Sequence, residues 1–360
     1  MREVEVVVVG AGQAGLAAAY HLRRFFEPET GFAVLDHAPH AGGAWQFRWP
    51  TLTFKTVNGV YQLPGMPVPR PEESTPVADV IPDYFAAYER EFDLRVQRPV
   101  SVRSVRSLPD KRLEVATDRG VWITKALINA TGTWERPFWP RYAGQQSFRG
   151  RQLHTAQYQG PEEFAGRRVV VVGGGISAIQ HLLEIHPLAA ATAWVTRRPP
   201  QWRDDDFNPD RGREAVAMVE ERVRKGLRPQ SVISVTGLPQ TPQIRAAREA
   251  GILERLPVFD RIEPDGVRWE DGRFVPADVI LWATGFRASL DHLAPLKLRG
   301  SGGGIVMDGT RVAADPRVHL VGYGPSASTI GANRAGRAAV REIRELLGRT
   351  GDSRASAPAV

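Results

Sequence analysis

A glycine-rich turn between an apolar strand and a helix occurs twice in this chain, and no other feature limits its fold as much. Residues 10–15, GAGQAG, follow the stretch 4–9, which is β-branched apart from Glu5, and residues 173–178, GGGISA, follow the stretch 168–172, which is apolar apart from Arg168. In such a turn one glycine permits the bend, one admits a pyrophosphate close to the backbone, and one lets the helix pack on the strand. Because the helix N-terminus then faces the anion, each copy predicts a dinucleotide-binding unit.

The residues after the second strand of each unit indicate which nucleotide is bound. In the first unit, strand 32–35 ends in Asp36, near the spacing expected for a carboxylate on an unphosphorylated ribose such as that of FAD. In the second, strand 192–195 ends in Thr196, Arg197 and Arg198, whose donors suit the 2′-phosphate of NADPH. The alternative is that both arginines are solvated surface residues.

Two similar tracts predict the domain boundaries. Residues 127–132, LINATG, precede the second unit, and residues 281–285, LWATG, follow it; both are expected to be strands that end in small residues beside a cofactor. We therefore expect an α/β fold with two Rossmann-like dinucleotide-binding domains, the NADPH domain being inserted into a discontinuous FAD domain. The predicted FAD domain is 1–160 plus 285–347, the NADPH domain is 161–284 with a partly helical insertion at about 201–256, and 348–360 is a disordered tail.

Composition excludes several function classes. The chain has no cysteine, which removes disulfide exchange, thiolate nucleophiles and thiolate metal sites, and we expect no metal. No apolar run approaches the length of a membrane helix and no charged leader precedes one, so we expect a cytoplasmic protein without a membrane anchor. The net charge of +7 is scattered, which argues against nucleic-acid binding and suits two anionic dinucleotides.

Residues 148–158, FRGRQLHTAQY, lie between the two units and carry a family resemblance. This FxGxxxHxxxY pattern resembles the signature of the class B flavoprotein monooxygenases, which include flavin-containing and Baeyer–Villiger monooxygenases. Further landmarks stand in the family's order: residues 42–45 (GGAW), 63–67 (LPGMP), both ATG tracts and 321–324 (VGYG). The chain looks closest to a compact bacterial branch, some members of which lie beside arsenic-resistance genes.

The resemblance implies that NADPH reduces FAD and that O2 adds to flavin C4a. The resulting (hydro)peroxyflavin would transfer one oxygen atom to a small soft-nucleophile substrate with an N, S or As centre. The Baeyer–Villiger signature normally closes on Trp, whereas Tyr158 and Gln159 stand here, which favours heteroatom oxygenation. An NADPH oxidase, an electron-transfer flavoprotein and a Baeyer–Villiger monooxygenase stay open as alternatives, as does a homodimer. A thioredoxin-reductase-like enzyme is excluded because it needs cysteines.

Three residues are predicted to act at the reaction centre. His154 and Tyr158 are expected to orient the linker and the nicotinamide, and Asn58 to contact the flavin, although Asn58-Gly59 is also a common hairpin turn. The predicted cofactor contacts are Gly10, Gly12, Gln13, Ala14, Gly15, Asp36, His37, Gly43, Trp45, Ala130, Thr131, Gly132, Gly173, Gly174, Gly175, Ser177, Ala178, Thr196, Arg197, Arg198, Ala283, Thr284, Gly285, Gly322 and Tyr323.

Overall fold

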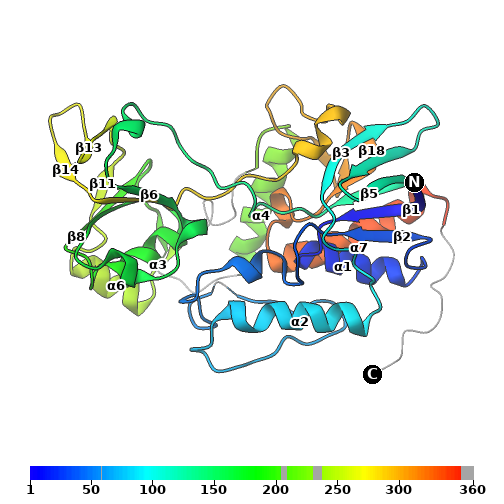
Figure 1. Cartoon of the computed structure of the whole chain (residues 1–360), viewed down its shortest axis with the longest axis horizontal. Coiled ribbons are helices and arrows are strands. Elements are labelled where there is room, and N and C mark those ends of the chain that lie inside the picture. The colour runs from blue at the N-terminus through cyan, green and yellow to red at the C-terminus, as the bar shows by residue number, and fades with distance from the viewer. Residues whose placement is uncertain (58, 204–208, 230–236, 350–360) are drawn as a thin grey trace.

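The computed structural model describes residues 1–57, 59–203, 209–229 and 237–349. Over these residues the chain forms two lobes, each built on a sheet with parallel strands at its centre (Figure 1). The predicted α/β class with two dinucleotide-binding folds is confirmed. None of the described helices has an apolar stretch long enough to cross a bilayer.

The first lobe contains an eight-stranded sheet among the described residues. Strand β1 (Arg2–Val9) pairs in parallel with β2 (Phe32–Leu35) on one side and β5 (Gly120–Asn129) on the other, and β18 (Asp315–Leu320) is parallel to β5. Val6, Val7 and Val8 are fully buried, as expected of a parallel strand covered on both faces. Short antiparallel strands extend the sheet: β3 (Val102–Ser107), β4 (Leu113–Thr117), β16 (Met307–Asp308) and β17 (Arg311–Val312).

Two helices pack closely against each other beside this sheet. Helix α1 (Gln13–Arg23) touches α7 (Thr329–Leu346) where Gly336 faces Ala18, and a Cβ at Gly336 would come within 2.8 Å of the Ala18 amide nitrogen. Helix α2 (Val77–Glu91) lies beyond them, below α1 in Figure 1. Three 3-10 turns complete the lobe: η1 (Gly43–Phe47), η5 (Asp291–Leu296) and η6 (Gly324–Ser326).

The second lobe contains a five-stranded parallel sheet in the order β11-β8-β7-β15-β6. Its strands are β6 (Arg151–His154), β7 (Arg168–Val172), β8 (Ala191–Thr196), β11 (Arg255–Pro257) and β15 (Val279–Trp282). The other elements are α3 (Ile176–Ile185), α6 (Pro242–Glu249), β9 (Trp202–Arg203), β10 (Leu238–Pro239), β12 (Arg261–Glu263), β13 (Gly266–Arg268), β14 (Phe274–Pro276), η2 (Gln145–Ser147), η3 (Thr155–Gln157) and η4 (Pro161–Phe164). Strand β6 thus joins this sheet although it precedes residue 160, where the sequence predicts the domain boundary.

Helix α4 (Pro209–Arg224) belongs to the charged segment 201–256 but packs on the first lobe. Its Val223 is buried in the same apolar cluster as Val7 and Leu127, and a Cβ at Gly324 would lie 2.9 Å from Val223. In Figure 1, α4 accordingly stands beside the first lobe, away from α3 and α6. The predicted disordered tail lies outside the described residues from residue 350 onward.

Two of the connections between the lobes, around residues 136–138 and 284–287, are hydrogen-bonded to each other. The Phe138 amide donates to the Gly285 carbonyl at 2.9 Å, and the Arg287 amide donates to the Arg136 carbonyl at 2.8 Å. The Thr284 hydroxyl also donates to the Phe138 carbonyl. Because of these hydrogen bonds, each of the two connections restrains the position of the other.

Candidate functional site

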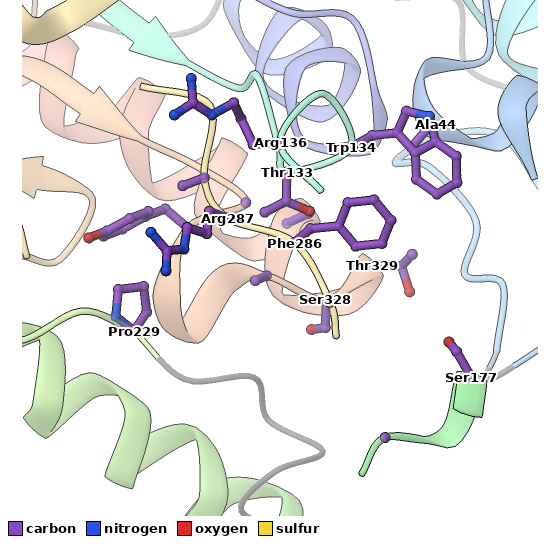
Figure 2. Close-up of a pocket in the computed structure, with 18 of the residues that line it drawn as sticks. Ala44, Thr133, Trp134, Arg136, Ser177, Pro229, Phe286, Arg287, Ser328 and Thr329 are labelled. Carbon is purple, nitrogen blue, oxygen red and sulfur yellow. The ribbon is translucent and has the colours of Figure 1, made fainter. Parts of the chain in front are cut away.

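Both glycine-rich turns open on one cavity of about 3840 Å³ between the lobes. Gly10 and Gly12 line it at the end of β1, and Gly173 and Gly175 line it at the end of β7. Figure 2 shows Ser177, at the start of α3, across open space from Ser328 and Thr329 at the start of α7. Ligands of open α/β sheets bind at the carboxyl ends of the strands, and here two such ends face the same space.

The helices that follow these turns begin without a side-chain cap. Gly12 is the N-cap of α1 and Gly175 that of α3; no side chain that the structure describes caps either helix, and neither first turn holds an acidic residue. By contrast, the Ser328 side chain accepts a hydrogen bond from the Gly331 amide at the start of α7. The free amides and the positive end of the helix dipole at α1 and α3 therefore suit the pyrophosphates of two dinucleotides.

The glycines of the first turn differ in how much space there is for an added Cβ atom. A Cβ at Gly15 would lie 1.9 Å from the Gly10 carbonyl oxygen, so a glycine is needed there to pack the helix on the strand. A Cβ at Gly12 would meet only Gly43, at an ordinary 4.0 Å, and one at Gly175 would meet nothing within 4 Å. Gly12 and Gly175 thus keep open space on the cavity side, where a pyrophosphate fits.

Asp36 lies at the end of β2, lines the cavity and is only 4% exposed. Its Oδ2 accepts hydrogen bonds from Arg98 Nε at 3.2 Å and Nη2 at 3.1 Å, and Arg98 also pairs with Glu89. This arginine offsets the cost of a buried carboxylate, and Asp36 Oδ1 receives no hydrogen bond among the described residues. The carboxylate is therefore held in place with one oxygen available to a ribose. Arg98 is far from Asp36 in the sequence, and no local motif marks it.

The residues after β8 form the predicted 2′-phosphate site. Thr196, Arg197 and Arg198 line the cavity, and both arginines are exposed. Thr196 is buried, and its hydroxyl donates to the Arg198 carbonyl at 2.7 Å and accepts from Arg255 Nε at 2.8 Å. The threonine hydroxyl is thus used to shape the turn, while the two guanidinium groups are available to an anion. The supporting Arg255 was not predicted.

His154 and Tyr158 lie outside the cavity wall and connect the lobes from behind it. His154 Nε2 donates to the Gly285 carbonyl at 3.0 Å while Nδ1 accepts from the Ala156 amide at 3.1 Å, an arrangement of the neutral ring. Burial lowers the pKa of His154, in keeping with that state. Because Gly285 belongs to the second ATG tract, the imidazole ties the end of β6 to a connection between the lobes, the kind of contact that orienting the linker requires.

Tyr158 and Thr51, a residue of the first lobe, donate hydrogen bonds to the same carboxylate, that of Glu184. The Tyr158 hydroxyl donates to Glu184 Oε2 at 2.6 Å, and the Thr51 hydroxyl donates to the same oxygen at 2.7 Å. Burial raises the pKa of Tyr158, so the phenol keeps its proton. Glu184 on α3 thereby fixes the segment after η1 to the second lobe. The sequence analysis missed it because a lone glutamate on a helix carries no local signal.

Most of the predicted cofactor contacts line the cavity. They are Gly10, Gly12, Gln13, Ala14, Asp36, His37, Gly43, Trp45, Ala130, Thr131, Gly132, Gly173, Gly174, Gly175, Ser177, Thr196, Arg197, Arg198, Ala283, Thr284, Gly285, Gly322 and Tyr323. Gly15 and Ala178 are buried behind the turns, and Asn58 lies outside the described residues. Within the described part of the chain, no group of acidic or histidine side chains has the arrangement of a metal site.

Residues 7–306 match the pyridine nucleotide-disulphide oxidoreductase family. The chain belongs to this family. A solved flavin-containing monooxygenase from Stenotrophomonas maltophilia is similar to it with a TM-score of 0.81 and 36% identity, over 96% of this chain and 100% of that one. This similarity confirms the resemblance to the flavin-containing monooxygenases that the motifs predict.

Curated relatives match this chain over shorter stretches. An uncharacterized CzcO-like oxidoreductase of Geobacillus kaustophilus is 31% identical over 182 residues, which is 51% of either chain. A probable indole-3-pyruvate monooxygenase of Arabidopsis thaliana is 30% identical over 204 residues, covering 53% of this chain and 46% of the relative. The chain spans about half the length of these relatives.

A buried histidine lies behind the cavity between two aromatic rings. His181 on α3 packs between Tyr158, with ring centroids 4.1 Å apart, and Trp49, at 4.9 Å. Neither ring nitrogen has a hydrogen-bond partner in the described part of the chain, and burial lowers the pKa of His181 to about 3. The neutral ring contributes its full share of stability above its unfolded pKa of 6.5, and this share is lost as the pH falls toward the folded value.

Replacing this histidine should make the protein less sensitive to acid. The His181→Leu protein should lose about 2 to 3 kcal/mol less free energy of unfolding than the wild type between pH 7 and pH 4.5, measured by urea denaturation. Part of the loss should remain, because burial also lowers the pKa values of His21 and His292 to about 4. His40→Leu, at an exposed site, should behave as the wild type. An unchanged loss in His181→Leu would rule out His181 as its source.

Proposed function

We propose that this chain is a FAD- and NADPH-dependent monooxygenase that transfers one oxygen atom from O2 to a small soft nucleophile with an N, S or As centre. The observation that carries the proposal is the pair of uncapped helix N-termini, at Gly12 and Gly175, which open on one cavity. Two dinucleotides bound there would bring their redox-active rings into a shared space.

Particular residues would hold each cofactor. The amides after Gly12 would bind the FAD pyrophosphate, and Asp36 would accept hydrogen bonds from its ribose. On the opposite wall, the start of α3 with Ser177 would bind the NADPH pyrophosphate, and Arg197 and Arg198 would pair with its 2′-phosphate. When bound, FAD supplies the redox chemistry, accepting a hydride from NADPH and activating O2.

The protein's own contribution is to position the cofactors and to limit access of water. Helix α4 lines the cavity through Val216, Ala217 and Glu220, and so covers one side of the site. His154 Nε2 donates its hydrogen bond to the Gly285 carbonyl, which supports a role for this residue in positioning the connection and not in proton transfer to substrate. The absence of cysteine from the chain leaves no thiol for the disulfide chemistry that the family name implies.

Similarity and sequence together support oxygenation over other outcomes of flavin reduction. The Stenotrophomonas maltophilia relative, aligned over its whole length, is a flavin-containing monooxygenase by name. The Tyr158-Gln159 pair, in place of the Trp that the Baeyer–Villiger signature carries, favours a heteroatom substrate.

The test is the fate of the oxygen during NADPH turnover. The purified protein, loaded with FAD, is given NADPH, air and one of three probes: methyl phenyl sulfide, N,N-dimethylbenzylamine or phenylarsonous acid. We expect at least one probe to yield its oxide in an amount close to the NADPH consumed, as measured by chromatography. Stoichiometric hydrogen peroxide with every probe would show an oxidase instead, and an ester from cyclohexanone would show a Baeyer–Villiger enzyme.

Two alanine variants in the first glycine-rich turn distinguish an effect on FAD affinity from an effect on the stability of the fold. Gly12→Ala should change the free energy of unfolding of the FAD-free protein by about 1 kcal/mol or less, because the added methyl meets no close neighbour. It should nevertheless weaken FAD binding by roughly tenfold or more, since the methyl occupies the space that a pyrophosphate needs.

Gly15→Ala should show the opposite order of effects. Its methyl collides with the Gly10 carbonyl, so the FAD-free protein should lose about 1 to 3 kcal/mol of stability. Calorimetric unfolding and FAD titration measure the two quantities separately. A Gly12→Ala protein with wild-type affinity for FAD would contradict the proposed FAD site.

A further inference from the structure

Arg48 follows η1 directly and lies at the wall of the cavity beside the proposed FAD site. The first residue of η1, Gly43, packs against Gly12, since a Cβ at Gly43 would lie 2.8 Å from the Gly12 Cα. The 3-10 turn η1 is five residues long, and Arg48, the residue after it, lines the same cavity as the glycine-rich turn.

The guanidinium of Arg48 has no anionic partner among the described residues. Its Nε is shielded from solvent and makes no hydrogen bond, and the side chain as a whole is partly buried. Burial lowers the pKa of Arg48 to about 10, which still leaves the group charged at neutral pH. A buried donor without a partner costs free energy, and pairing of the guanidinium with an anion is a usual compensation. Arg136, which lines the same cavity, shows the contrast, because its guanidinium pairs with Asp291.

Aromatic rings surround this arginine and continue along the cavity wall. The Arg48 Cζ lies 4.6 Å from the ring centroid of Trp134 and 5.7 Å from that of Trp45. Trp134 stacks on Phe286 at 5.0 Å, and on its other neighbour, Phe47, at 6.4 Å. In Figure 2, Trp134 and Phe286 lie next to each other at the open part of the pocket. The rings offset part of the arginine's desolvation and offer planar apolar surface to a ligand.

We propose that Arg48 is a specificity residue that binds the carboxylate of a planar, apolar substrate whose ring lies against Trp134 and Phe286. The fork of guanidinium donors matches a carboxylate in geometry and charge. The proposal rests on the proposed function, because it places the acid in the cavity that FAD and NADPH share. It narrows the substrate class to aromatic or similarly flat acids that carry a soft nucleophilic atom.

A guanidinium would also bind a cofactor phosphate, and the following experiment distinguishes a substrate carboxylate from a cofactor phosphate as the partner of Arg48. Isothermal titration calorimetry measures the binding of 2-naphthoate and of its neutral counterpart 2-naphthamide to the FAD-free and FAD-loaded protein. The variants are Arg48→Met, which keeps a long apolar side chain over Trp134, and Arg136→Met as the matched control. The dissociation constants for FAD and NADPH are measured in the same variants.

We expect the wild type to bind the acid roughly ten to a hundred times more tightly than the amide, as a charge-assisted contact implies. Arg48→Met should remove this preference and leave FAD and NADPH binding unchanged, whereas Arg136→Met should keep it. Trp134→Ala should weaken the acid and the amide alike.

Equal affinity for acid and amide in the wild type, or a preference that survives in Arg48→Met, would overturn the proposal. Weaker FAD or NADPH binding in Arg48→Met, without an acid preference in the wild type, would assign Arg48 to a cofactor phosphate and overturn it as well. Failure of the proposed function is distinguishable, because a protein that binds no FAD can still be tested for the acid preference in its FAD-free form.

Discussion

The free amide groups at the N-termini of α1 and α3 are the constraint on which the rest of the structure depends. Each helix starts at a glycine that offers no side chain to its own amides, so each start leaves amides that can bind an external anion. Parallel strands bring such helix starts to the carboxyl edge of a sheet, and the two sheets here point those edges into one cavity. The proposed pairing of FAD with NADPH follows from this geometry.

Holding two such sites at a useful separation requires a defined junction between the lobes. Two of the connections between them are hydrogen-bonded to each other around residues 136–138 and 284–287, and His154 adds a contact to one of them at Gly285. Glu184 fixes α3 to Thr51 in the first lobe through a second route, and α4 crosses from the charged insertion to pack by Val223 on the first lobe. Trp49 of the first lobe also belongs to the same buried apolar cluster as Tyr158 and Ile179 of the second, so the junction has apolar contacts as well as polar ones.

The elements around the two glycine turns could be predicted from the sequence, and the contacts between distant elements could not. Residues 6–9 and 169–172 are continuous runs of valine because both faces of a parallel strand are buried, so a strand before each glycine turn could be predicted. Strand β6 pairs with β15, more than a hundred residues later, and no local pattern indicates that pairing. Arg98, Glu184 and Arg255 contact predicted site residues that lie 62, 26 and 59 positions away along the chain. Arg48 likewise lies over the ring of Trp134, which is far from it in the sequence.

The central claim is that FAD and NADPH meet in this cavity, and anaerobic reduction tests it most directly. The purified protein, mixed with NADPH in the absence of O2, should lose the absorbance of its bound oxidised FAD in a rapid phase. NADH should be much less effective, because it lacks the 2′-phosphate that Arg197 and Arg198 would bind. A protein that takes up no FAD, or whose bound FAD is reduced by neither nucleotide, would contradict the account.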